Sequence, residues 1–108
     1  MGKTYWLLVL TEENFRATAD REFSLQGVDT RQRRKAVRMA EEDRMMFYIS
    51  DRQAFAASTT LTSDHFEDHE RIWKTHREEE DFPHRVKMRS DVVVDEERWV
   101  DANQVGPR

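Results

Sequence analysis

The stretch that decides the fold is Met45 to Ser63, which reads MMFYISDRQAFAASTTLTS. In its first arm one face collects the apolar residues Met45, Phe47 and Ile49. After a polar turn at residues 50–53, one face of the second arm collects Phe55, Ala57, Thr59 and Leu61. Alternation with a period of two on both sides of a short turn is typical of a β-hairpin. We therefore expect an antiparallel hairpin around which the other elements pack.

The chain before this hairpin predicts one strand and one helix. Residues 4–10, TYWLLVL, are apolar on both faces, which favours a central strand buried on two sides. Thr11 is suited to cap a helix, because Glu12 and Glu13 follow where the helix dipole favours acids. This helix is expected to end at about Asp20, and residues 23–29, FSLQGVD, form a loop or short strand.

A second helix is predicted from Arg31 to about Glu41, capped by Asp29 or Thr30. Four cations fall on one side of it, at spacings i, i+3, i+4 and i+7: Arg31, Arg34, Lys35 and Arg38. No acid interrupts this basic stripe, so it can bind phosphates, although most charge runs are ordinary solvated faces. Both interpretations stay open from the pattern alone.

The chain after the hairpin is polar and then extended. Residues 64–81 are acidic and predict a long connection with partial helix, followed by a strand that starts at Pro83. In that strand Arg85, Lys87 and Arg89 form a second, weaker basic row, expected on its solvent side. A last turn over residues 96–104 should cover one barrel end with Trp99, and residues 105–108 should be a frayed tail.

Composition limits the class of protein. The chain has 108 residues, which suits one domain spanning 1–108, and its net charge of −4 argues against a non-specific nucleic-acid coat. There is no cysteine, which excludes disulfides and thiolate metal sites. No apolar run is long enough to span a bilayer, so no membrane contact and a cytoplasmic location are expected.

Trp73 and the histidines are the remaining candidate binding residues. Trp73 lies in the polar connection with few apolar neighbours, so it is either a stacking surface for a flat ligand or rim packing. His65 and His69 have i, i+4 spacing, but the motif matches no established zinc spacing, so neither metal nor cofactor is expected. No catalytic motif is present, since the sequence lacks G-x-S-x-G and a glycine-rich phosphate loop.

Five segments together resemble the EVE domain family of the PUA-like superfamily, which is related to the YTH readers: YWLLVLTEENF, FSLQGVD, FYISDRQAFAASTTLTS, the Ile72-Trp73 pair and FPHRV. The resemblance runs from about Tyr5 to about Val94. It implies an α+β fold, a small PUA-like β-barrel of mostly antiparallel strands flanked by helices. It also implies a pocket that accepts a modified base extruded from a nucleic-acid strand.

The resemblance also implies a set of site residues. The pocket would be formed by Asn14 as a base reader, the wall segment Ser24, Gln26, Gly27 and Val28, the floor residue Phe55 and the aromatic wall Trp73. The helix carrying Arg31, Arg34, Lys35 and Arg38 would face phosphates. Two positions depart from the family pattern, since Gln26 stands where many relatives have tryptophan and Ala57 where glycine is frequent.

Three functions follow as hypotheses. The first is a non-catalytic reader whose partner is DNA or RNA carrying a modified base. The second is a hydrolase of modified nucleosides on the same barrel type, and the third is a protein-interaction module with a vestigial pocket.

Overall fold

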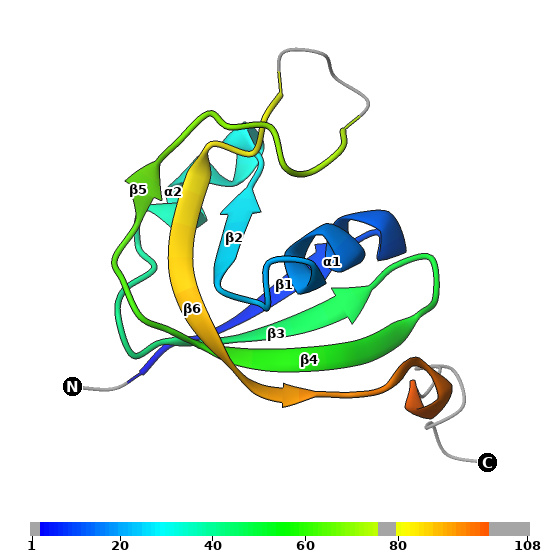
Figure 1. Ribbon diagram of the computed structural model, residues 1–108. Helices are drawn as coiled ribbons and strands as arrows, with labels where there is room; N and C mark the ends of the chain where they lie inside the picture. The colour runs from blue at the N-terminus through cyan, green and yellow to red at the C-terminus, as the bar shows by residue number, and fades with distance from the viewer. Residues whose placement is uncertain (1–2, 76–79, 100–108) are drawn as a thin grey trace.

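The computed structural model describes residues 3–75 and 80–99 as a curled sheet with two helices (Figure 1). The strands are β1 (Tyr5–Leu10), β2 (Leu25–Val28), β3 (Arg44–Ile49), β4 (Ala54–Leu61), β5 (Phe66–Glu67) and β6 (His84–Val93). The helical segments are α1 (Glu12–Ala19), the 3-10 turn η1 (Thr30–Gln32), α2 (Arg33–Ala36) and the 3-10 turn η2 (Glu96–Arg98).

The sheet is mixed, in the order β1-β3-β4-β6-β2, with β5 paired to β6. β1 runs parallel to β3, and every other pairing is antiparallel. β1 and β2 are the two ends of this curled path, so the barrel is half open between them. The predicted α+β class with a small, mostly antiparallel PUA-like barrel is confirmed, as is the central hairpin of β3 and β4.

The core lies between the concave side of the sheet and α1. Thr11 caps α1 as predicted, accepting a hydrogen bond from the Asn14 amide at 3.2 Å. Phe15 from α1 contacts Phe47 of β3 edge-on, with ring centroids 6.2 Å apart, and Trp99 after η2 at 5.7 Å. Trp99 therefore covers one end of the core as expected, whereas residues 100–108 lie outside the described part of the chain.

The prediction that β1 is a central strand is wrong. β1 is an edge strand, and Tyr5, Leu7 and Val9 are 70%, 60% and 55% exposed. Apolar residues on both faces normally indicate burial on both faces. Here the second apolar face lies on the outside of the sheet, which the sequence of a single strand cannot show.

Two other predicted elements are corrected. The second helix does not run from Arg31 to Glu41, because η1 and α2 end at Ala36 and the chain then turns to bury Met39 in the core. Within the described residues of the 64–81 connection there is no helix, and only the two residues of β5 pair. Asp29 does act as the N-cap, accepting from the Arg31 amide at 2.5 Å.

A β-bulge changes which face of β4 is buried. Phe47 pairs with Ala57, but the next residue, Tyr48, pairs with Phe55, so Ala56 is the extra residue. Leu61 is therefore fully buried, whereas Phe55 is 45% exposed. The predicted single face of Phe55, Ala57, Thr59 and Leu61 is broken at this bulge.

Asp43 fastens β1 to the loop that precedes β3. Its carboxylate accepts hydrogen bonds from the Thr4 amide at 3.0 Å, the Trp6 indole at 3.0 Å and the Ala40 amide at 3.1 Å. Burial would raise the pKa of Asp43, but these hydrogen bonds together hold it below the ordinary aspartate value. The charged form is therefore the one that stabilises the fold.

We predict that Asp43→Asn lowers the free energy of unfolding by about 1–3 kcal/mol near neutral pH, because charge-assisted bonds are lost. A depressed folded-state pKa gives stability that is present above the unfolded pKa and is lost as pH falls through the folded pKa. The loss of parent stability below about pH 4 should thus be smaller in the variant. Urea unfolding across pH measures both effects, with the exposed Asp20→Asn as the control. Parallel pH curves for parent and variant would contradict this role.

Candidate base-binding pocket

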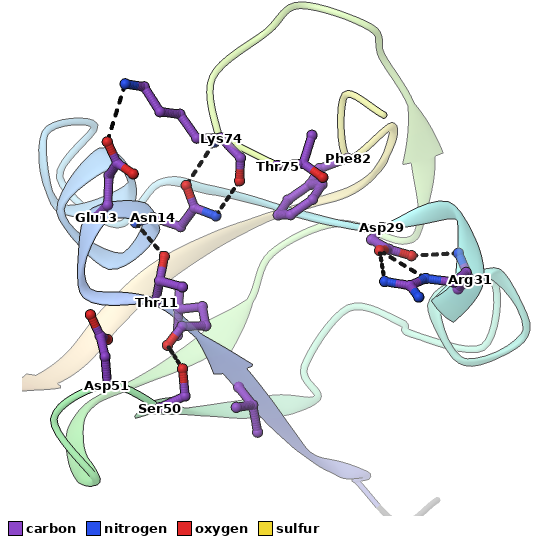
Figure 2. Close-up of a pocket in the computed structure, with 12 residues that line it drawn as sticks. Thr11, Glu13, Asn14, Asp29, Arg31, Ser50, Asp51, Lys74, Thr75 and Phe82 are labelled. Carbon is purple, nitrogen blue, oxygen red and sulfur yellow. Dashed lines mark hydrogen bonds and ion pairs between the residues drawn. The ribbon is translucent and has the colours of Figure 1, made fainter. Parts of the chain in front are cut away.

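The described residues form a pocket of about 560 Å³ at the half-open side of the barrel (Figure 2). Its lining comes from the end of β1, the start of α1, the β3–β4 turn, the residues after β2, and the 73–82 loop. The lining residues are Val9, Leu10, Thr11, Glu13, Asn14, Asp29, Arg31, Ser50, Asp51, Lys74, Thr75 and Phe82. Its volume lies in the range of small-ligand sites.

Asn14 is the one predicted pocket residue from α1, and the structure places it in the lining. Its side-chain amide donates to the Lys74 carbonyl at 2.8 Å, and its carbonyl accepts from the Lys74 amide at 2.7 Å. This two-bond clamp ties the 73–82 loop to α1 (Figure 2). Asn14 thus positions the pocket wall. Both the nitrogen and the oxygen of its side-chain amide are hydrogen-bonded to the Lys74 backbone.

Phe82 supplies the aromatic wall of the pocket. Its ring stacks on Trp73 at a centroid distance of 6.2 Å and an interplanar angle of 17°. The backbone of Phe82 is in the left-handed region, with φ 52°, which is a rare conformation for a bulky residue. Such strain persists only where neighbours hold it in place, and it concentrates at functional sites.

Two neighbouring side chains hold Phe82 in this conformation. The buried Glu80 carboxylate accepts from the Phe82 amide at 3.0 Å and from the Thr30 amide at 3.2 Å, which links the loop to η1. Arg85 donates through Nε to the Phe82 carbonyl at 3.0 Å. Both backbone polar groups of Phe82 are therefore fixed by charged side chains.

Trp73 is buried, with 3% exposure, and does not line the pocket. Phe82 stacks on its ring, and the Arg85 guanidinium lies 5.2 Å from the ring centroid. Gly27 packs closely against the Trp73 ring as well, because a Cβ added to Gly27 would lie 2.6 Å from the ring atom Cζ3. Trp73 therefore supports the Phe82 ring from the protein interior. Although Trp73 lies in a polar loop, it is packed against Phe82, Arg85 and Gly27.

Gln26 belongs to the same buried layer. The Trp73 indole donates to the Thr18 hydroxyl at 2.9 Å, which in turn donates to the Gln26 side-chain carbonyl at 2.7 Å. The Gln26 amide donates to the Gly27 carbonyl at 2.8 Å. The side chain that departs from the family pattern thus uses its donor and acceptor inside the protein rather than toward a base.

Arg85 is fully buried, so the predicted basic row of Arg85, Lys87 and Arg89 is wrong at its first member. Its guanidinium donates to the Asp81 carbonyl at 3.1 Å and to the Glu70 carbonyl. Burial lowers the pKa of Arg85, and nearby carboxylates, Asp68 first, oppose this shift. The side chain gathers three loop carbonyls and so shapes the pocket wall.

The remaining predicted pocket residues lie elsewhere. Ser24 is exposed, and its hydroxyl donates to the Arg21 carbonyl at 2.7 Å. Val28 is buried in β2. Phe55 is not the pocket floor, because the bulge turns it to the outer face of the sheet, where it packs on Tyr48 at 5.0 Å.

Charges in the pocket are mostly paired. Glu13 lies 3.2 Å from the Lys74 ammonium, and Asp29 lies 3.2 Å from the Arg31 guanidinium. Arg31 thus joins the pocket to the basic stripe, in which Arg34, Lys35 and Arg38 are all exposed. Arg31, Arg34 and Lys35 lie on the continuous η1 and α2, whereas Arg38 follows the end of α2, so the helical spacing that predicted the stripe does not extend to it.

Residues 3–75 and 80–99 include both histidines that were weighed as metal ligands, His65 and His69. His65 contacts His84 at 3.0 Å, whereas His69 contacts Asp81 at 2.8 Å, so the two predicted histidines face different partners. No group of three or more potential metal ligands occurs among these residues. Within the same ranges no helix is long and apolar enough to cross a membrane.

Sequence reasoning missed Phe82, Lys74 and Thr18. The signal available for Phe82 was an aromatic residue at the end of a polar loop, which is the signal that singled out Trp73. Thr18 and Lys74 gave no signal, because their roles depend on partners 55 and 60 residues away along the chain.

Comparison with known proteins identifies the family. The EVE domain model matches residues 4–104. The chain belongs to the EVE domain family. No curated protein matches the sequence of this EVE domain.

Solved structures show where the fold recurs. The EVE domain resembles a crystal structure of the Mmi1 YTH domain with a TM-score of 0.62 and 11% identity, covering 90% of this chain and 70% of that one. A structure of the YTH domain-containing protein mmi1 with RNA gives 0.60 and 11%, covering 85% and 58%. A further Mmi1 YTH domain gives 0.61 and 11%, covering 88% and 55%. The chain thus spans little more than half the length of two of these chains, and the likeness shows a shared fold.

We predict that Gly27→Ala destabilises the domain by about 1–3 kcal/mol through overpacking. The new Cβ would lie 2.5 Å from the Phe82 carbonyl oxygen and 2.6 Å from Trp73 Cζ3, so the pocket wall must shift. Thermal and urea unfolding measure the loss, with the exposed Ser24→Ala as the matched control. A Gly27→Ala protein as stable as Ser24→Ala would show that the wall is loosely packed.

Proposed function

We propose that this EVE domain is a non-catalytic module that binds a DNA or RNA strand and holds one extruded, modified base against Phe82. The observation that carries the proposal is the Phe82 ring. It is half-buried, lines a pocket of about 560 Å³, is backed by Trp73 and stands on a strained backbone. A preorganised aromatic wall of this kind suits stacking with a flat ligand.

The distribution of charge supports a base inside the pocket and phosphates outside it. Glu13, Asp29 and Asp51 line the pocket, and such carboxylates repel a phosphate while they can accept hydrogen bonds from base amino groups. Cations follow directly on the rim, where Arg31 begins the exposed stripe. Phosphate contacts at the stripe would supply affinity and pocket contacts selectivity.

Selectivity for a modification must come from shape. A methyl group adds about 0.8 kcal/mol when it is buried, which gives only a few-fold preference. The apolar part of the lining, Val9, Leu10 and Phe82, offers the wall that would reward such a group. RNA is present in the solved complex of the mmi1 YTH protein, whose fold is shared, and this supports testing RNA and DNA strands alike.

The alternatives make different predictions. For a nucleoside hydrolase the pocket carboxylates would act on substrate, but Asp51 accepts from the Glu12 amide at 2.7 Å and Asp29 caps η1, which gives both a structural role. A protein-interaction module would show no affinity for any oligonucleotide. Oligonucleotide binding therefore separates the protein-interaction module from the other two functions, and product analysis separates the hydrolase from the reader.

We predict that Phe82→Ala weakens binding of the preferred modified oligonucleotide at least tenfold, because aromatic stacking contributes about 1–3 kcal/mol per base. The matched control is Phe66→Ala, a half-buried phenylalanine of β5 outside the pocket lining. Titration of both variants against modified and plain strands of DNA and RNA measures the effect, with circular dichroism to check folding. A folded Phe82→Ala protein with parental affinity would reject this stacking role. Release of a modified base or nucleoside would favour the hydrolase.

The basic stripe should set affinity without setting base choice. Arg34→Ala combined with Lys35→Ala is expected to weaken modified and plain strands alike, and to reduce the salt slope of log K by about 1.5. The control is Lys87→Ala with Arg98→Ala, which removes the same charge from exposed residues outside the stripe. An unchanged slope in the first pair, or an equal change in both pairs, would remove the stripe from the interface.

A further inference from the structure

The outer face of the sheet carries a second feature that the pocket does not use. We call it the outer patch, and it consists of five exposed hydrophobic residues on four strands: Leu7, Val9, Met46, Phe55 and Val92. Their exposed fractions range from 42% to 60%. Contiguous exposed apolar surface on a small protein marks an interaction site more often than chance scatter does.

Strand register shows that the outer patch is continuous. Leu7 pairs with Met46, Met46 with Ser58 and Ser58 with Val92, which forms one row across four strands. The next row on the same face runs from Val9 through Tyr48 to Phe55. Paired residues on neighbouring strands lie about 5 Å apart, so the two rows form one surface.

The described helix that packs on this sheet lies on its other side. Phe15 of α1 contacts Phe47, whose side chain points opposite to those of its neighbours Met46 and Tyr48. Figure 1 shows α1 on the concave side of β3 and β4. The exposed fractions confirm that the outer patch is open to solvent.

Charged residues flank the outer patch with opposite sign at its two ends. Arg44 and Arg89 both pair with Thr60, so they lie in one row across the sheet, on the side toward the first residue of β3. Asp91 lies 3.9 Å from the Arg89 guanidinium, so this side keeps a net positive charge through Arg44. Asp51 follows the other end of β3, and Asp95 follows the other end of β6, which runs parallel to β3. A two-fold axis in the plane of the face, perpendicular to the strands, would place each arginine end over an aspartate end of the second copy.

We propose that the occupant of the outer patch is a second copy of this chain, which forms a two-fold, face-to-face sheet dimer. Two sheets packed face to face lie about 10 Å apart, with strands nearly aligned. The axis would pass along the row of Leu7, Met46 and Val92, so these residues meet their own copies. The apolar rows form the centre and the arginines and aspartates the polar rim, which is the usual composition of such interfaces. Among the residues that line the base pocket, Val9 and Asp51 take part.

The first test is the oligomeric state of the parent chain and of Met46→Lys, measured by sedimentation equilibrium over a range of concentrations. The parent should dimerise reversibly. Met46→Lys should raise the dimer Kd at least tenfold, because two ammonium groups would meet near the axis. The control is Val37→Lys, an equally exposed position at 44% that follows α2 and lies outside the sheet, and it should dimerise as the parent does. Circular dichroism checks that each variant is folded.

The second test uses charge reversal at the two ends. Arg89→Glu and Asp95→Arg should each weaken the dimer, and the double variant should recover most of the parental Kd, because each end then again faces its opposite. A parent chain that is still monomeric at about 1 mM overturns the proposal. So does a dimer that tolerates Met46→Lys, which would place the contact elsewhere, such as the free edge of β1. Additive losses in the double charge variant would overturn the antiparallel arrangement. Oligonucleotide titration is a separate readout, so failure here leaves the base pocket untouched.

Discussion

The burial of one guanidinium, that of Arg85, is the constraint on which the pocket depends. A buried cation is costly unless its hydrogen bonds are satisfied. Here the carbonyls of Glu70, Asp81 and Phe82 accept from Nε and Nη2, and the Trp73 ring covers the guanidinium. Nη1 has no hydrogen-bond partner among the described residues and lies 3.8 Å from the Asp68 carboxylate. Those partners come from the two described ends of the 70–82 segment, so the guanidinium holds these two ends together. Phe82, whose backbone is in the left-handed region, lines the pocket at one of these two ends.

The site is built in two layers. The predicted pocket residues Gln26, Gly27 and Trp73 are brought together, but they form the inner layer, in which Thr18 links Gln26 to Trp73 and Gly27 packs on the Trp73 ring. The outer layer that a ligand would meet is Phe82, and Asn14 is clamped to Lys74 beside it. A Gln at position 26 is therefore compatible with a well-formed pocket, because its side-chain carbonyl accepts from the Thr18 hydroxyl and extends the buried network that begins at the Trp73 indole.

The sheet serves a different purpose on each face. Its concave face forms the core with α1, and its outer face presents apolar rows between charged ends. The half-open barrel explains both features. β1 pairs only with β3 in the described sheet, so its other side borders the pocket, and its second apolar face is left toward solvent. β1, which the sequence predicts to be buried on both faces, thus contributes to the core, the pocket and the outer patch.

The sequence by itself determined the hairpin and the Thr11 cap, because alternation and capping act over a few residues. The order of five segments also indicated the family and thereby the fold class. Tertiary structure alone decided that β1 is an edge strand, that the bulge at Ala56 turns Phe55 outward, and that α2 ends at Ala36. It also decided that Phe82 rather than Trp73 faces the pocket. These features depend on contacts between residues far apart in the chain, such as Trp73 with Thr18, and on which ring is covered once Arg85 is buried.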